Sequence, residues 1–205
     1  MRKSILSAAV AMLMAGAAVG AQAQSLVSNG DFELSNVATG AAETFANISA
    51  TQGWGNLQWG SYSNSSAIVD TAGNQAARVS LGDVIWSAFQ APTAGAYTLS
   101  FDTVGDGFYA LYDATTSSMV NGGFLQNSSL TSVSASVSLN STDIYRVYFG
   151  AMVLPPSFNS TLTIDNVAVT AAVPEPETYA MMLAGLGAIG LMSRRRLNGN
   201  GKRAA

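Results

Sequence analysis

The acidic and aromatic side chains are the ones that could do chemistry in this sequence of 205 residues, because it contains no cysteine and no histidine. This excludes a Ser-His-Asp triad, an imidazole base, a thiol nucleophile, a disulfide and a zinc site built on imidazole or thiolate. Any metal ion would have to be held by oxygen. Paired carboxylates about 5 to 9.5 Å apart can hydrolyse glycosides, but Asp102, Asp106 and Asp113 lie around turn glycines and are better explained as turn residues. The sequence predicts no enzyme, and a glycan hydrolase is the least favoured alternative.

Three aromatic residues, Trp54, Trp59 and Tyr62, cluster in one Gly- and Asn-rich stretch. A sugar offers a C–H face and a rim of hydroxyls, so a solvent-facing ring beside polar groups can bind it. We identify these three residues as candidate ligand contacts. The alternative is that they plug one end of a hydrophobic core. Trp86 and Phe89 lie in an apolar segment and are predicted to be core residues.

The charge of the chain is distributed unevenly. Residues 24–173 carry ten acidic side chains and only two basic ones, Arg78 and Arg146, so their net charge is −8, whereas that of the whole chain is −3. A body this acidic does not bind nucleic-acid phosphates or anionic lipid by charge. Cations and neutral partners remain, and no nucleic acid is expected as a partner.

The middle of the chain is predicted to consist of β-strands. Apolar and polar residues alternate in some segments, which indicates strands with one solvated face, and more apolar segments indicate inner strands. Turn sequences rich in Gly, Pro and Asn separate them. The predicted strands are 67–70, 76–81, 84–91, 97–101, 108–112, 133–139, 145–149 and 161–170. Residues 24–172 are therefore predicted to form one all-β domain, an antiparallel jelly-roll-like β-sandwich.

The last predicted strand changes its buried face part-way along. Leu162 and Ile164 are apolar at even positions, whereas Val167 and Val169 are apolar at odd positions. A strand absorbs such a change with one extra residue, so the sequence predicts a β-bulge across Asp165–Asn166. A bulge at this point would also redirect the neighbouring side chains.

Both ends of the chain have the features of targeting segments. Residues 1–23 begin with positive charge, continue with an apolar run and end in a small-residue cleavage site, which predicts a signal peptide; a membrane helix is the alternative. Near the other end, the apolar segment 178–192 would be a short hydrophobic helix of about 22 Å, against a hydrocarbon core of about 30 Å. The cluster Arg194, Arg195 and Arg196 follows it as a cytoplasmic stop. Such a segment is a marginal permanent anchor.

Pro174, Glu175 and Pro176 precede this segment, and the paired prolines keep the chain extended and accessible there. With the apolar segment and the arginines, they closely resemble the PEP-CTERM sorting signal, so residues 173–205 are identified as such a tail. The resemblance implies a transient anchor in the inner membrane of a Gram-negative bacterium, processing by the membrane protease exosortase, and sorting to the cell surface or extracellular matrix. The alternative is a plain C-terminal anchor with accidental prolines.

Three parts of the central domain carry a second resemblance: residues 26–33 together with Gly53-Trp54, residues 95–101, and residues 163–167. They are similar to the galactose-binding-like jelly rolls of carbohydrate-binding modules. In that family the first and last segments lie side by side and often share a structural calcium ion, so the resemblance makes Glu33 and Asp165 candidate Ca²⁺ ligands. Calcium accepts six to eight oxygens, backbone carbonyls included. The alternative is that both carboxylates cap turns or accept hydrogen bonds from backbone amides.

These features together predict an exported, exosortase-processed and non-catalytic protein of the cell surface or biofilm matrix. Its expected partner outside the cell is extracellular polysaccharide. The alternative from a different class is a purely structural or self-associating matrix component without a sugar site.

Overall fold

The computed structural model describes residues 24–34, 37–45, 53–58, 66–155, 160–172 and 184–186. Several predictions concern residues outside these ranges. They are the signal peptide 1–23, the candidate contacts Trp59 and Tyr62, the sorting residues Pro174, Glu175, Pro176, Arg194, Arg195 and Arg196, and most of the apolar segment 178–192. Within the described part of the tail, Ala184–Leu186 is helical and exposed, and no helix of the described residues is long and apolar enough to cross a membrane.

Residues Gln24–Ala172 form one compact unit of β-strands. The strands are β1 (Ala42–Thr44), β2 (Gly55–Gln58), β3 (Ala67–Thr71), β4 (Asn74–Ser80), β5 (Asp83–Gln90), β6 (Gly95–Asp113), β7 (Ser118–Leu139), β8 (Ile144–Ala151) and β9 (Thr161–Ala171). All neighbouring strands pair antiparallel. The predicted all-β, antiparallel architecture is confirmed.

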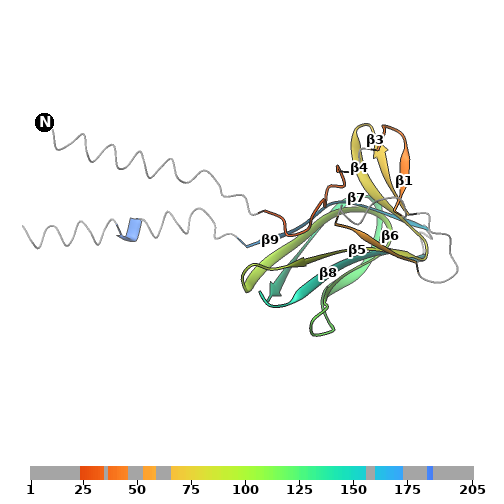
Figure 1. Cartoon of the computed structure of the whole chain (residues 1–205). Helices are drawn as coiled ribbons and strands as arrows, with labels where there is room; N and C mark the ends of the chain where they lie inside the picture. Colours follow the sequence, from red (N-terminus) through yellow and green to blue (C-terminus); the bar gives the residue numbers. More distant parts are fainter. Residues whose placement is uncertain are drawn as a thin grey trace, which may run out of the picture. The chain divides into compact units, whose positions relative to one another are not determined.

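The sheet is curled, and β6 joins its two halves (Figure 1). The first part of β6 pairs with β9, which continues through β4 and β3 to β1. The second part of β6 pairs with β8, which continues through β5 to β2. β7 runs along the other side of β6 over its whole length. The two halves enclose one core, as the contact between Phe101 of β6 and Phe149 of β8 shows, with ring centroids 4.9 Å apart.

The predicted β-bulge in the last strand is confirmed. Asp165 stands opposite Asp102, and Ala168 stands opposite Ser100. Asn166 and Val167 of β9 therefore face the single β6 residue that lies between Ser100 and Asp102. Asn166 adopts a left-handed backbone conformation with φ of 52°, which asparagine tolerates better than most residues. The bulge lets both apolar pairs of β9 point into the core, where all four side chains are buried.

The N-terminal segment lies beside β9, as the second resemblance implied (Figure 1). The amide of Leu26 donates to the carbonyl of Val169, and the amide of Val167 donates to the carbonyl of Gly30, both at 2.8 Å. A Cβ atom on Gly30 would collide with the carbonyl oxygen of Val167. Only glycine permits this close approach of two backbones, so Gly30 holds the first segment against the last strand.

Candidate functional site

The outer surface of β5, β8 and the second part of β6 is rich in aromatic rings. Trp86 of β5 lies opposite Tyr148 of β8, Tyr112 of β6 lies opposite Arg146, and Phe108 lies opposite Gly150. The residues next to them along each strand that point inward include Ile85, Val147 and Leu111, which are fully buried. Because side chains alternate across a strand, the rings must point away from the core. The aromatic face is defined here as Trp86, Phe108, Tyr112, Arg146 and Tyr148.

Two glycines lie directly beneath rings of the aromatic face. A Cβ atom added to Gly55 of β2 would lie 2.5 Å from Cε2 of Trp86, and one added to Gly150 would collide with the ring of Phe108. Each ring therefore occupies the space that a side chain would fill at the neighbouring strand position. Close packing against the backbone fixes a ring in place, and both rings remain only partly buried.

Polar groups stand between the rings. The guanidinium of Arg146 lies 5.0 Å from the centroid of the Trp86 ring, at the distance of a cation–π contact. Its Nη1 donates to the hydroxyl of Tyr148 at 3.5 Å, and its buried Nε has no hydrogen-bond partner among the described residues. The Tyr112 and Tyr148 rings meet edge to face with centroids 6.5 Å apart. The face therefore combines ring surfaces with hydroxyl and guanidinium groups.

Apolar side chains extend the aromatic face at both margins. Phe124 of β7 lies opposite Phe108 and is 73% exposed, and Leu57 of β2 lies opposite Val84 and is 52% exposed. β2 pairs with β5, β5 pairs with β8, and β8 pairs with Phe108–Tyr112 of β6. Among the outward positions of these paired segments, Arg146 is the only charged residue. Exposed apolar surface rimmed by polar groups is typical of an interaction site.

Trp54, one of the three predicted ligand contacts, belongs to the core. Its side chain is 4% exposed, its ring centroid lies 4.9 Å from that of Phe32, and its Nε1 donates to the carbonyl of Asn29 at 2.9 Å. The Trp54 ring offers no face to solvent. It matches the alternative interpretation, in which this residue plugs one end of the core. Trp59 and Tyr62 lie outside the described residues, and their role stays a prediction.

Trp86 was predicted to be a core residue, and this prediction is wrong because the ring lies on the outer surface. Phe89, three residues along the same strand, is in the core as predicted. β5 carries apolar residues on both of its faces, which made it resemble a fully buried strand. The signal that could have found the aromatic face is in β8, where Arg146, Tyr148 and Gly150 alternate with Tyr145, Val147 and Phe149.

The two candidate calcium ligands lie near each other where the first segment meets β9. Glu33 accepts hydrogen bonds from the backbone amide and the side-chain amide of Gln75, at 2.7 and 3.3 Å. Asp165 accepts from the side chain of Asn74 at 3.0 Å and from the amide of Asn166 at 2.7 Å. Burial raises the pKa of Asp165, and the negative charges of Asp102 and Glu33 raise it further.

These carboxylate contacts include the backbone amides that the alternative interpretation expects. Among the described residues, no group of three or more acidic side chains is arranged to hold a metal ion. A calcium ion here would need oxygens from the backbone or from amide side chains besides Glu33 and Asp165. Asp165 is buried and feels the negative charges of Asp102 and of the exposed Glu33, which would attract a cation, and the calcium site stays a proposal.

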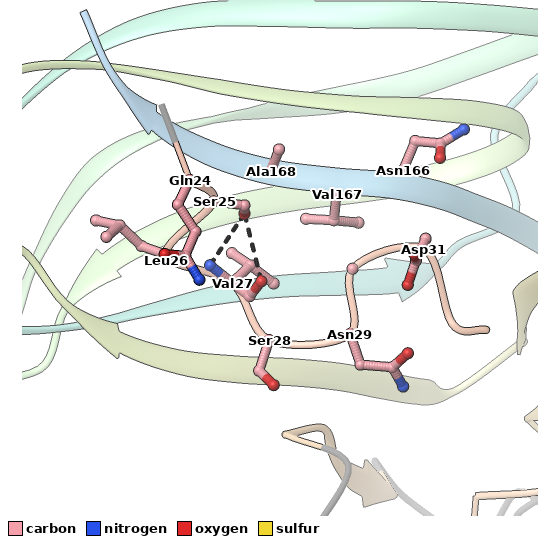
Figure 2. Close-up of a pocket in the computed structure, with 11 residues that line it drawn as sticks. Gln24, Ser25, Leu26, Val27, Ser28, Asn29, Asp31, Asn166, Val167 and Ala168 are labelled. Carbon is pink, nitrogen blue, oxygen red and sulfur yellow. Dashed lines mark hydrogen bonds between the residues drawn. The ribbon is translucent and has the colours of Figure 1, made fainter. Parts of the chain in front are cut away.

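A hollow of about 650 Å³ lies between the N-terminal segment and β9 (Figure 2). Its lining consists of Gln24, Ser25, Leu26, Val27, Ser28, Asn29, Gly30, Asp31, Asn166, Val167 and Ala168. Figure 2 shows Ser25 bonded to the backbone of Val27, with its Oγ 3.2 Å from the amide and 3.3 Å from the carbonyl oxygen. The lining contains no aromatic ring, so this hollow cannot stack a sugar as the aromatic face could.

Comparisons with known proteins agree with two of the predictions. Residues 172–196 match the PEP-CTERM protein-sorting motif, which indicates a protein sorted to the cell envelope or surface. No curated protein matches the sequence. A solved structure described as "CBM4 structure and function" has 11% identity and a TM-score of 0.51, over 71% of this chain and 99% of that one.

A second solved structure, TmCBM61 in complex with β-1,4-galactotriose, has 13% identity and a TM-score of 0.48, over 73% of this chain and 99% of that one. Both are carbohydrate-binding modules. At such low identity the first likeness shows the fold alone, and it confirms the predicted jelly-roll-like β-sandwich.

Proposed function

We propose that this chain is an exported surface protein whose β-sandwich binds extracellular polysaccharide on the aromatic face. The observation that carries the proposal is the packing of two outward rings, Trp86 and Phe108, directly onto glycines of the neighbouring strands. Rings held in this way are preorganised for the C–H faces of sugars, which lowers the entropy lost on binding. A contiguous, partly exposed apolar surface rimmed by polar groups is typical of an interaction site.

The polar groups of the face complete the chemistry that a sugar requires. The Tyr112 and Tyr148 hydroxyls can donate and accept, and the guanidinium of Arg146 offers several N–H groups to sugar oxygens. The aromatic face carries no carboxylate, so it has no acid or base with which to cleave a glycosidic bond. The proposed role is binding without catalysis.

The sorting motif supplies the route to the polysaccharide. We propose that exosortase processes the chain near Pro174, Glu175 and Pro176 after the apolar segment has held it transiently in the inner membrane. The protein then reaches the cell surface or extracellular matrix of a Gram-negative bacterium. Mass spectrometry of the envelope and the medium should find the chain without its arginine cluster. Recovery of the intact C-terminus alone would contradict this route.

A structural calcium ion between Glu33 and Asp165 is a second proposal about the same domain. The negative charges of Glu33 and Asp102 already act on the buried Asp165 carboxyl, and a cation would relieve this repulsion. The ion would link the first segment to β9, where Gly30 and Val167 are already in contact. Its effect would be on stability, because the site lies on the other half of the sheet from the aromatic face.

Binding of the unit Gln24–Ala172 to polysaccharide from the producing cells tests the main proposal. Trp86→Ala and Tyr148→Ala should each reduce binding about fivefold or more, since stacking of one sugar ring contributes on the order of 1 kcal/mol or more. Leu34→Ala is the matched control, because it removes a side chain that is 66% exposed outside the face. The proposal fails if no polysaccharide binds, or if the two face variants bind as well as the control at unchanged melting temperature.

A further inference from the structure

β7 forms one complete edge of the curled sheet. Within the described residues it pairs only with β6, whose other side is covered by β9 and then by β8. The strands at the opposite edges, β1 and β2, have only three and four residues. Proteins commonly keep edge strands short or place charges and prolines in them, because an open edge pairs with other chains. β7 has 22 residues, none of which is charged or a proline.

A bulge leaves the second part of β7 as a regular edge. Thr131 stands opposite Thr103 and Asn127 opposite Gly105, so Ser128 to Leu130 form extra length that interrupts the pairing. From Thr131 to Leu139 the register with β6 is unbroken. This regular stretch of nine residues exceeds the usual strand length of about five or six. Its small outward side chains, mostly serine, leave the backbone of the edge accessible.

The residues of this stretch are nearly symmetric about Ala135. Ser134 mirrors Ser136, Val133 mirrors Val137, and Ser132 mirrors Ser138. An antiparallel pair of two such strands, with a two-fold axis at Ala135, places each of these residues opposite one of its own kind. The serines then meet on the outer surface, where hydroxyls form cross-strand hydrogen bonds, and the valines meet on the inner one.

We propose that two copies of this chain associate by antiparallel pairing of Thr131–Leu139, with the two-fold axis at Ala135. The sheet then continues from one copy into the other, and both copies use the same surface. No residue of β7 is charged, so pairing along this strand brings none of its own charges together, although the body has a net charge of −8. This inference does not depend on polysaccharide binding.

Sedimentation of the unit Gln24–Ala172, which contains the whole hydrophobic core, tests the pairing. The wild type should form dimers, and the double variant Ser134→Lys, Ser136→Lys should be monomeric at the same concentration, since its ammonium groups would stand opposite each other. The matched control is Thr98→Lys, Ser100→Lys, which changes the positions opposite these serines on β6, one strand in from the edge. The control adds the same charge and should remain dimeric.

Single cysteines test the axis itself without a background, because the chain has no cysteine of its own. Ala135→Cys should form a disulfide-linked dimer, since residues that face each other across a pair are about 5 Å apart. Ser138→Cys should not link to itself. Residue 138 lies three residues from the axis, so residue 138 of one copy and residue 138 of the other are about 20 Å apart. A mixture of Ser138→Cys with Ser132→Cys should link.

Several results would overturn the proposal. A wild type that is monomeric at all accessible concentrations removes it, and so does a dimer that persists in the folded β7 lysine variant. Self-linking of Ser138→Cys together with Ala135→Cys would indicate parallel pairing in register. If the lysine variant does not fold, the cysteine pattern alone decides, because Ser→Cys leaves the size of the side chain nearly unchanged and Ala135→Cys adds only one sulfur atom.

Discussion

The replacement Gly55→Ala tests whether the Trp86 ring is held rigidly on the backbone of β2. The new Cβ atom would lie 2.5 Å from Cε2 and 2.7 Å from Cζ2 and Nε1 of the ring. Carbon atoms attract each other best at about 3.5 to 4.0 Å. The ring or the short edge strand must therefore move by about 1 Å. Either movement changes the surface that a sugar would contact.

The expected loss of stability is small and can be worked out from two opposing effects. Overpacking costs about 1 to 3 kcal/mol. Replacing glycine by alanine in an extended strand gains about 0.4 to 1 kcal/mol, because the unfolded chain loses freedom. The net loss is about 0.5 to 2 kcal/mol, and in a domain of about 150 residues each kcal/mol lowers Tm by about 2 to 4 °C. Because the domain remains folded despite this loss, any reduction in polysaccharide binding by Gly55→Ala reports the displaced Trp86 ring and not unfolding.

A double-mutant cycle isolates the contact between Gly55 and Trp86. In a Trp86→Ala background the added Cβ meets empty space, so Gly55→Ala should become neutral or slightly stabilising. Urea unfolding of the four proteins should give a coupling energy of about 1 to 3 kcal/mol. An equal loss in both backgrounds would refute the reasoning, because the Trp86 ring would then not rest on Gly55.

Four further predictions follow from the core and the segment beside β9. Trp54→Phe should cost about 1 kcal/mol through the lost hydrogen bond to the Asn29 carbonyl, without changing polysaccharide binding measured on the folded variant. Gly30→Ala should cost about 3 kcal/mol or more in urea unfolding, because its Cβ meets the immovable backbone of β9. The pKa of Asp165 is raised in the folded state, so the protonated carboxyl stabilises the fold at low pH, and this contribution is lost as the pH rises through that pKa. In the presence of a chelator, Asp165→Asn should therefore gain stability relative to the wild type as the pH rises above about 4. A difference in stability that does not change with pH would contradict this. Chelation should lower the Tm of the wild type and leave that of Glu33→Gln unchanged; equal responses would argue against a calcium site.

Strand alternation carried most of the fold prediction because burial imposes a period of two on an amphipathic strand. The bulge in β9 was predictable for the same reason: the change from Ile164 to Val167 as inward residues requires one extra residue. The long β7 was only partly predictable. Its first part, from Ser118 to Asn127, has polar and glycine residues without alternation, and it is a strand because its backbone pairs with β6.

The aromatic face could not be predicted in the same way because both faces of β5 and β6 carry large apolar residues. Periodicity distinguishes core from surface only when the surface is polar. Trp86 therefore resembled Phe89, although one lies outside and the other inside. Trp54 shows the opposite error. Its glycine-rich surroundings predicted exposure, but its indole packs against Phe32 and bonds to backbone, a contact between segments that are distant in sequence.

The two proposed surfaces lie on different halves of the sheet, and this has a measurable consequence. The regular part of β7 pairs with the part of β6 that adjoins β9, whereas the aromatic face belongs to the half with β8, β5 and β2. A dimer joined at Thr131–Leu139 would carry two aromatic faces, so a long polysaccharide could bind both, with a gain in avidity of about 10² to 10⁴. Titration with a short oligosaccharide should give the same affinity for wild type and for Ser134→Lys, Ser136→Lys, whereas the long polymer should bind the wild type far more tightly. If the wild type and the lysine variant bind the polymer with equal affinity, one polysaccharide molecule does not bind both aromatic faces of a dimer at once, because only the dimer offers two faces.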